Sequence, residues 1–144
     1  MLDHAMMDGF VPESANSGEL YVWGSNCNNS LGPQQSRSTP ELLDVFHKKY
    51  PEELICKVGV EKFHSLIVTS AGRVYSCGHG QGGRLGLGTQ QTVVIPEMVH
   101  FPDTSHGESV MCIDAAIARD HSIFLCSDGN VSIYRFFFII VSLE

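Results

Sequence analysis

Two histidine-serine pairs have the residue types of a general base beside a nucleophile. They are His64-Ser65 and His121-Ser122, and a serine next to a histidine can be activated for attack on a substrate. A catalytic pair is needed once in a protein, whereas a structural device is needed in every copy of a repeat. We therefore interpret both pairs as structural and expect each histidine, at the start of a strand, to bond to a neighbouring backbone carbonyl.

A glycine-rich stretch, residues 78–83, satisfies the G-x-G-x-x-G pattern of dinucleotide sites, and Asp103 follows it at about the spacing that such a site uses. A dinucleotide site also needs a helix N-terminus behind the glycines. The sequence that follows, RLGLGTQQTVVI, contains two further glycines and a β-branched run that disfavour helix. We predict a turn between strands here, and no cofactor.

The same loops carry candidate metal ligands and charged contact residues. Cys27, Cys77 and His79 could approach one another, but Cys77 occupies the position of Trp23 in an earlier copy, so we interpret it as packing and predict no metal site. Arg84 and Arg119 are isolated cations on loop-like segments. An acidic partner and plain solvation are both open for them, and we favour solvated surface charge. No catalytic residue is predicted, and the chain is not expected to be an enzyme.

These features recur because the sequence repeats. Residues 18–32, GELYVWGSNCNNSLG, align without a gap with residues 72–86, GRVYSCGHGQGGRLG, and the two histidine-serine pairs stand 57 residues apart, from 64 to 121. We predict an N-terminal segment and linker over 1–17 and copies over 18–71 and 72–128. The positions that we expect to carry the repeat are Gly18, Tyr21, Trp23, Gly24, Leu31, Gly32, His64, Gly72, Tyr75, Cys77, Gly78, Leu85, Gly86, His121 and Gly129.

A third copy opens at Gly129 and then departs from the pattern. Ser132 stands at the position of the repeat tyrosine, and Tyr134 stands at the position of the tryptophan or cysteine. Arg135 stands at the position of the next glycine. We predict an aborted third copy over 129–144 that ends in an apolar tail. The run after Arg135 is uncharged, free of proline and β-prone, which is typical of aggregation-prone sequence.

Each copy predicts a β sheet. Short apolar alternations such as LYVW, VYSC, HSLIVTS and HSIFLCS are bounded by turn glycines. Gly72 and Gly129 suit hairpin turns, and Gly24 and Gly78 end strands where a side chain would obstruct the neighbouring backbone. Only residues 40–49, PELLDVFHKK, predict a helical turn or two, with Leu42, Leu43 and Phe46 on one face.

A period of 54–57 residues with several strands in it is close to that of a propeller blade. The pattern G-x-[LV]-Y-x-[WC]-G-x(6)-L-G, then P-E, then H-S resembles the regulator of chromosome condensation repeat family. The resemblance implies an all-β fold, an incomplete β-propeller with about two of seven blades. Two blades cannot close a ring, so we expect an unprotected apolar face and self-association through the open blade edge.

The resemblance also implies a function. In one branch of the family, ankyrin repeats precede the propeller and BTB domains follow it, and residues 2–8 resemble the closing helix of an ankyrin repeat. Such proteins are interaction scaffolds, which implies protein partners such as a tyrosine kinase or components of a cullin-type ubiquitin ligase. The alternative that the family offers is guanine-nucleotide exchange on a Ran-like small GTPase.

Composition limits the other classes of partner. The net charge is −7, from 9 basic against 16 acidic residues, which repels nucleic acid. Five cysteines without a Cys-x-x-Cys pair indicate reduced, mostly buried thiols, and the N-terminus has no signal-peptide pattern, so we expect a cytoplasmic or nuclear protein. The apolar run 133–143 is shorter than a membrane helix needs, and no membrane partner is expected.

Overall fold

The computed structural model describes residues 19–104, 107–134 and 138–142, the last of these by its backbone alone. In these ranges no helix has the length and apolar character that crossing a bilayer requires. The elements are β1 (Tyr21–Gly24), β2 (Arg37–Leu42), α1 (Asp44–Lys49), β3 (Ile55–Val60), β4 (His64–Thr69), β5 (Val74–Gly78), the 3-10 turn η1 (Gln81–Gly83), β6 (Val93–Val99), β7 (Cys112–Ala118), β8 (His121–Cys126), β9 (Asn130–Tyr134) and β10 (Phe138–Ser142).

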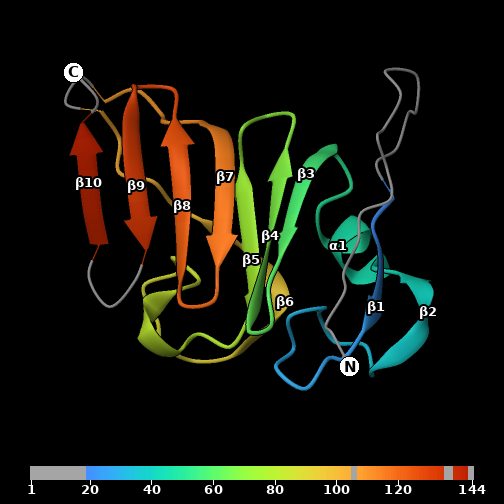
Figure 1. Ribbon diagram of the computed structural model, residues 1–144. Helices are drawn as coiled ribbons and strands as arrows, with labels where there is room; N and C mark the ends of the chain where they lie inside the picture. The colour runs from blue at the N-terminus through green and yellow to red at the C-terminus, as the bar shows by residue number, and fades with distance from the viewer. Residues whose placement is uncertain (1–18, 105–106, 135–137, 143–144) are drawn as a thin grey trace.

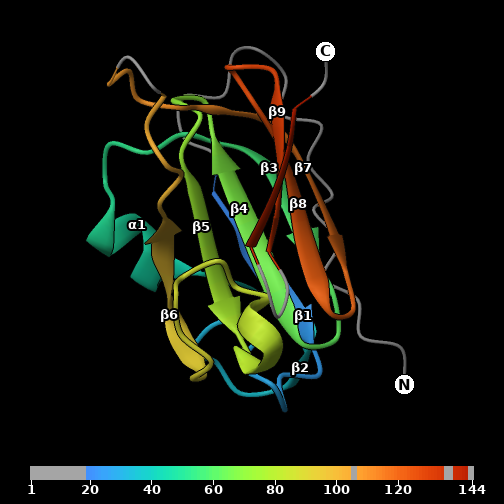
Figure 2. The ribbon, with the colours of Figure 1, turned by 90° about the vertical axis from the view of Figure 1, so that its left-hand side faces the viewer.

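The strands form three antiparallel sheets that follow one another across the molecule (Figure 1). The strand orders are β1-β2, β3-β4-β5-β6 and β10-β9-β8-β7. Strand β7 of the last sheet contacts β3 and β4 of the middle one. Helix α1 lies beside β6, on the other side of the middle sheet from β8 and β9 (Figure 2).

Each four-stranded sheet is built from two sequence copies, which corrects the expectation of one sheet within each copy. The predicted boundary at Ala71-Gly72 falls in the β4–β5 hairpin, and the boundary at Asp128-Gly129 falls in the β8–β9 hairpin. The end of one copy thus supplies two strands, and the start of the next copy supplies the other two. Consecutive copies are joined by backbone hydrogen bonds as well as by packing.

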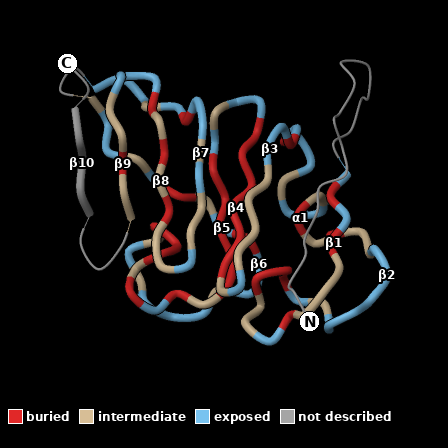
Figure 3. The backbone as a smooth tube through the Cα atoms, viewed as in Figure 1, coloured by how far each residue is buried: buried red, intermediate tan, exposed pale blue. Residues whose placement is uncertain are grey.

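Strand β4 lies at the centre of the molecule, and all six of its residues are buried (Figure 3). Because side chains alternate across a strand, Ile67 packs on one side with Phe46 and the N-terminal part. Leu66 and Val68 pack on the other side with Phe124 of the last sheet. One strand therefore holds both hydrophobic clusters together.

The last sheet leaves one face open, as expected of blades that do not close a ring. Ile123 and Leu125 stand 57 residues after Leu66 and Val68 and alternate along β8 with buried Phe124. Leu66 and Val68 are 1% and 3% exposed, whereas Ile123 and Leu125 are only partly buried and belong to neither cluster of the described chain. The apolar positions that join the middle sheet to the last one recur here, and within the residues that the structure describes no further sheet packs against them.

The segment 40–49 is only in part the helix that the sequence predicts. Pro40 and Leu42 lie in strand β2, which pairs with β1, and the helix begins at Asp44. Leu43 and Phe46 are buried as expected, at 2% and 0% exposure. Strand β2 is almost wholly exposed, so it lacks the alternation that marks a half-buried strand.

The third copy departs from the sequence pattern but keeps the strand register. Ile123 of β8 pairs with Ile133 of β9, as Leu66 of β4 pairs with Ser76 of β5. The backbone then turns back as β10, which pairs with β9. The predicted aggregation tendency of the tail concerns side chains outside the described part. The N-terminal segment 1–17 and its ankyrin resemblance also lie outside it.

Two glycine positions confirm the turn chemistry expected of them. Gly72 and Gly129 have φ of 72° and 81° in the hairpins that follow β4 and β8. Gly78 has φ of 119°, and a Cβ there would lie 2.4 Å from the Phe63 carbonyl oxygen and 2.7 Å from the His64 Cα. Glycine is required at the end of β5 by conformation and by space together.

We expect Gly78→Ala to lower the free energy of unfolding by about 3 kcal/mol, because the methyl group would force β5 away from β4. Gly129→Ala is the matched control, since it also has positive φ but nothing lies within 4 Å of the added Cβ. Its cost should stay near 1 kcal/mol. Urea unfolding followed by Trp23 fluorescence measures both, and equal losses would contradict the packing argument.

Candidate functional site

A serine in each copy bonds to a backbone carbonyl in a preceding loop. The Ser122 Oγ donates to the Arg84 carbonyl oxygen over 2.8 Å, and the Ser65 Oγ donates to the Ser30 carbonyl oxygen. Ser30 and Arg84 stand directly before the Leu-Gly pairs of their copies. The carbonyl bond predicted for the histidine is therefore made by the serine that follows it.

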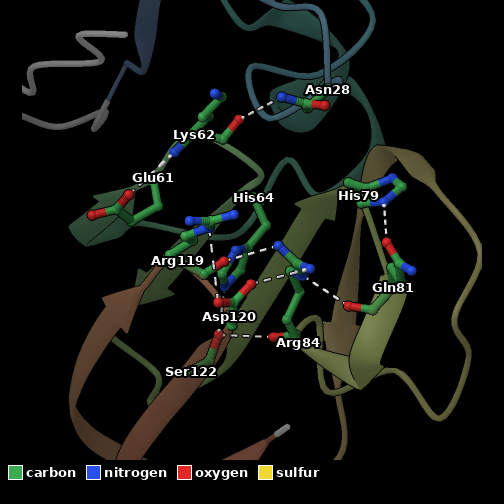
Figure 4. A network of polar contacts seen from close by, with 10 residues as sticks. All are labelled: Asn28, Glu61, Lys62, His64, His79, Gln81, Arg84, Arg119, Asp120 and Ser122. Atoms are coloured by element: carbon green, nitrogen blue, oxygen red, sulfur yellow. Dashed lines mark hydrogen bonds and ion pairs between the residues drawn. The ribbon is translucent and has the colours of Figure 1, made fainter. Parts of the chain in front are cut away.

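His64 makes a different contact, which joins the two copies. Its Nε2 lies 2.9 Å from the Ser122 Oγ (Figure 4). Since the single hydroxyl proton of Ser122 goes to the Arg84 carbonyl, the Nε2 must carry a proton and donate it to the Ser122 oxygen. The Nδ1 of His64 is buried and has no hydrogen-bond partner among the described residues. His64 thus fixes one sheet against the next.

The environment of His64 keeps its ring neutral. Burial, and next the positive charge of Arg84, lower the pKa of His64 to about 4 from 6.5. The carboxylate of Asp120 acts in the opposite direction. A neutral ring with its proton on Nε2 cannot take a proton from Ser122, and Ser122 has no exposed surface. The pair acts as a link between sheets rather than as a base and a nucleophile.

Arg84 is a buried part of the same network, which corrects the expectation of a solvated charge. It is 7% exposed. Its guanidinium donates to the carbonyl oxygens of Gln81 and Arg119, both over 2.8 Å, and lies 3.4 Å from an Asp120 carboxylate oxygen. Burial lowers the pKa of Arg84, and its contact with Asp120 opposes that shift. Arg84 ties the glycine-rich loop to the β7–β8 turn.

Arg119 remains exposed but lies close to a hairpin turn of the other sheet. Residues 62–65, KFHS, are the repeat equivalents of residues 119–122, RDHS. The stacking of the two sheets brings these turns together, so the guanidinium carbons of Arg84 and Arg119 lie 4.8 and 5.5 Å from the centre of the Phe63 ring. The Lys62 Nζ lies 5.6 Å from the same centre. Three cations from three loops surround one aromatic ring.

The predicted repeat positions are alike between the copies at some sites and differ at others. The leucine-glycine pairs are alike in both copies, with Leu31 and Leu85 at 5% and 0% exposure and Gly32 and Gly86 at positive φ. Tyr21 is 44% exposed whereas Tyr75 is 2% exposed. Trp23 and His121 are half-buried, whereas Cys77 is buried. Gly24 and Gly78 both have positive φ. Gly18 lies outside the described residues.

The glycine-rich loop wraps a single 3-10 turn rather than starting an α-helix. Gly82, Gly83, Gly86 and Gly88 all have positive φ, and a Cβ on Gly80 would lie 2.0 Å from the Gln91 carbonyl oxygen. The glycines are explained by this tight path of the backbone. The loop, β6 and Tyr134 border a surface hollow of about 660 Å³. The turn geometry does not provide the helix N-terminus that binds a pyrophosphate.

The cysteines are unpaired, and three of the five are buried. The Cys77 thiol lies 3.6 Å from the Ser30 carbonyl oxygen, and burial raises its pKa to about 12. Cys27 is exposed. Among the residues that the structure describes, no three histidine, cysteine or acidic side chains gather as metal ligands.

A buried carboxylate was missed by the sequence reasoning because it does not recur. Glu53 is 5% exposed and accepts bonds from Arg73 and from the Tyr75 hydroxyl, the latter over 2.9 Å. Burial alone would raise the pKa of Glu53, but the hydrogen bonds from Arg73 and Tyr75 hold it below its ordinary value. Val110 occupies the equivalent position in the next copy. Phe63 was likewise missed, since Asp120 takes its place there.

We expect the free energy of unfolding to fall by about 3 kcal/mol as the pH drops from about 6.5 to about 4, because the unfolded chain protonates His64 before the folded chain does. Above pH 6.5 this contribution to stability is fully present. In His64→Gln, which keeps a donor for Ser122, the fall should be much smaller, whereas exposed His100→Gln should retain it. A pH series of urea unfolding curves checks this, and an unchanged fall in His64→Gln would refute it.

Comparisons with known proteins agree with this geometry. The model of the regulator of chromosome condensation (RCC1) repeat matches residues 71–125. The inhibitor of Bruton tyrosine kinase from Mus musculus is 41% identical over 117 residues, which are 78% of this chain and 8% of that protein. The Xenopus laevis protein of the same name is 39% identical over 137 residues, 90% of this chain and 10% of that protein. The chain thus spans a tenth or less of each of these two relatives.

A solved structure shows the same fold. Yeast RCC1 (Prp20), crystallised with Kap60, superposes with a TM-score of 0.66 at 18% identity, over 86% of this chain and 34% of that one. The two four-stranded sheets are therefore neighbouring blades, and β1 and β2 are part of a further blade. Residues 71–125 match the RCC1 repeat, and the described part of the chain has the fold of an incomplete β-propeller like that of yeast RCC1.

Proposed function

We propose that this chain is a non-enzymatic interaction module that binds a tyrosine kinase of the Bruton type and lowers its activity. The observation that carries the proposal is the 41% identity to the inhibitor of Bruton tyrosine kinase, which extends over 78% of this chain. The polar groups that looked catalytic hold the blades together, which leaves the exposed loops to contact a partner. Such a role suits the cytoplasm or the nucleus, where unpaired thiols stay reduced.

Binding to purified Bruton tyrosine kinase tests this proposal directly. We expect saturable binding of the full chain in surface plasmon resonance and slower phosphorylation of a peptide substrate by the kinase. An unrelated serine/threonine kinase is the control and should show neither effect. Absence of binding at micromolar concentrations would overturn the proposal. Binding without slower phosphorylation would overturn the inhibitory part and favour the adaptor role in a cullin-type ubiquitin ligase.

Nucleotide exchange on a Ran-like GTPase is the other function of the family. The likeness to yeast RCC1 concerns the fold alone, at 18% identity. A nucleotide-release assay separates the two functions, and faster release in the presence of this chain would favour exchange over kinase binding.

We also propose that copies of the chain associate through the face of the last sheet on which Ile123 and Leu125 of β8 lie. Ile123 and Leu125 repeat the positions by which the middle sheet packs on its neighbour, and their partial exposure leaves apolar surface to bury.

We expect Ile123→Asp to shift the chain toward monomer in sedimentation velocity, because a carboxylate on this face cannot be buried without cost. Ile95→Asp is the matched control, since Ile95 is 39% exposed on the outer strand β6. An equal shift in both variants, or in neither, would contradict this interface.

A further inference from the structure

The turns that meet between the two blades form a cationic surface that the blade packing does not account for. We name it the Phe63 patch, made of Lys62, Phe63, Arg84, Arg119 and Asp120. Lys62 and Phe63 come from the β3–β4 turn, Arg84 from the glycine-rich loop, and Arg119 and Asp120 from the β7–β8 turn. Figure 4 shows Arg84 and Arg119 on either side of Asp120.

The patch gathers like charges without neutralising them. Asp120 is the only acidic ion-pair partner of Arg84 and Arg119 in the described chain, and it lies 3.4 and 3.8 Å from their nitrogens. A charge-assisted hydrogen bond to a carboxylate is about 2.7–2.9 Å long, so these contacts are loose. Arg84 and Arg119 share the one carboxylate of Asp120, and Lys62 adds a third positive charge against Phe63. The Glu61 carboxylate bonds to the Lys62 backbone N–H, so three cations and two carboxylates leave an excess of positive charge in a protein whose net charge is −7.

The patch is also held in place before any ligand arrives. Arg84 is fixed by two backbone carbonyls and stacks on Phe63. The Arg119 side chain is 75% exposed, while its own carbonyl oxygen is held by Arg84. Because a guanidinium stacked on an aromatic ring loses less freedom on binding, an anionic group can bind here at low entropic cost.

We propose that the Phe63 patch binds an anionic side chain of a partner protein, a carboxylate or a phosphoryl group, with Arg119 and Lys62 as its direct ligands. This rests on the proposed function as an interaction module and names the chemistry of the partner segment. Nucleic acid is the less favoured polyanion, because the chain as a whole has a net charge of −7 and would repel a phosphate backbone.

Asp120 acts as an internal competitor for the same guanidinium groups. Its carboxylate lies between Arg84 and Arg119, at the place where an external anion would contact both guanidinium groups. Removing this charge should therefore strengthen anion binding, whereas a merely structural aspartate would leave binding unchanged or weaken it. The two variants Asp120→Asn and Arg119→Gln should change affinity in opposite directions.

The experiment measures fluorescence anisotropy of a labelled hexaglutamate peptide with the full chain at about 50 mM salt. We expect binding that weakens about fivefold or more in Arg119→Gln and tightens about threefold in Asp120→Asn. Arg37→Gln is the matched control, because Arg37 is 53% exposed and lies in the β1–β2 sheet. It should bind as the unchanged chain does. Thermal unfolding confirms that each variant is folded.

Further probes show whether the bound anion is a carboxylate or a phosphoryl group. Hexaglutamine should not bind. A peptide with one phosphoserine that binds more tightly than hexaglutamate would assign a phosphoryl ligand, and weaker binding would assign a carboxylate ligand. The proposal is overturned if hexaglutamate does not bind, if Arg119→Gln and Arg37→Gln lose equal affinity, or if oligothymidine of matched charge binds more tightly than both peptides.

The two proposals fail separately. If Bruton tyrosine kinase binds and hexaglutamate does not, the Phe63 patch is refuted and the interaction module stands. If hexaglutamate binds through Arg119 and the kinase does not, the patch stands and its partner is a different protein.

Discussion

The contact between the His64 Nε2 and the Ser122 Oγ is the point on which the arrangement of this chain depends. It is buried, it joins two sequence copies, and it continues through the Ser122 hydroxyl to the Arg84 carbonyl. One chain of hydrogen bonds thus connects the start of β4, the start of β8 and the glycine-rich loop. The hydrophobic cluster between the blades holds the sheets together, but apolar contacts are not directional. The series of hydrogen bonds is directional, so it fixes how far one blade is shifted along the other.

The same contact explains why the loops at this end of the blades are close enough to form a surface. When Ser122 is held against His64, the β7–β8 turn lies beside the β3–β4 turn, and Arg119 reaches Phe63. Arg84 closes the arrangement by bonding to the Arg119 backbone. The features that suggested catalysis are therefore structural in their first role. Their consequence for function is a rigid cationic surface offered to a partner.

The repeat made much of the fold predictable. Gly72 and Gly129 are predicted in hairpin turns and have the positive φ that such turns require. Gly78 is predicted where a side chain would obstruct the neighbouring backbone, and a Cβ there would lie 2.4 Å from the Phe63 carbonyl oxygen. Strands β2 and β6 were not foreseen, because exposed strands do not alternate clearly between apolar and polar residues. The first and last strands of each blade could not be predicted from the repeat pattern either, because the repeat begins at Gly72 while the sheet begins at Ile55.

The site was less predictable than the fold. Arg84 looked solvated because it stands in a loop, and only the stacking of the blades shows that its guanidinium is enclosed. Phe63 and Asp120 occupy equivalent positions with unlike side chains, so comparison of the copies gave no signal for them. Glu53 has no counterpart at all. Residues that act between copies need not recur in each copy, so the repeat pattern gives no signal for them.

A double-mutant cycle between His64 and Ser122 tests the central claim most directly. Unfolding free energies of His64→Ala, Ser122→Ala and the double variant, measured at neutral pH, give the coupling between the two side chains. If the hydrogen bond joins the blades, the coupling energy should be about 1–2 kcal/mol in favour of the pair. Additive effects within about 0.3 kcal/mol would contradict the account, because they would leave apolar packing alone to hold the blades in register.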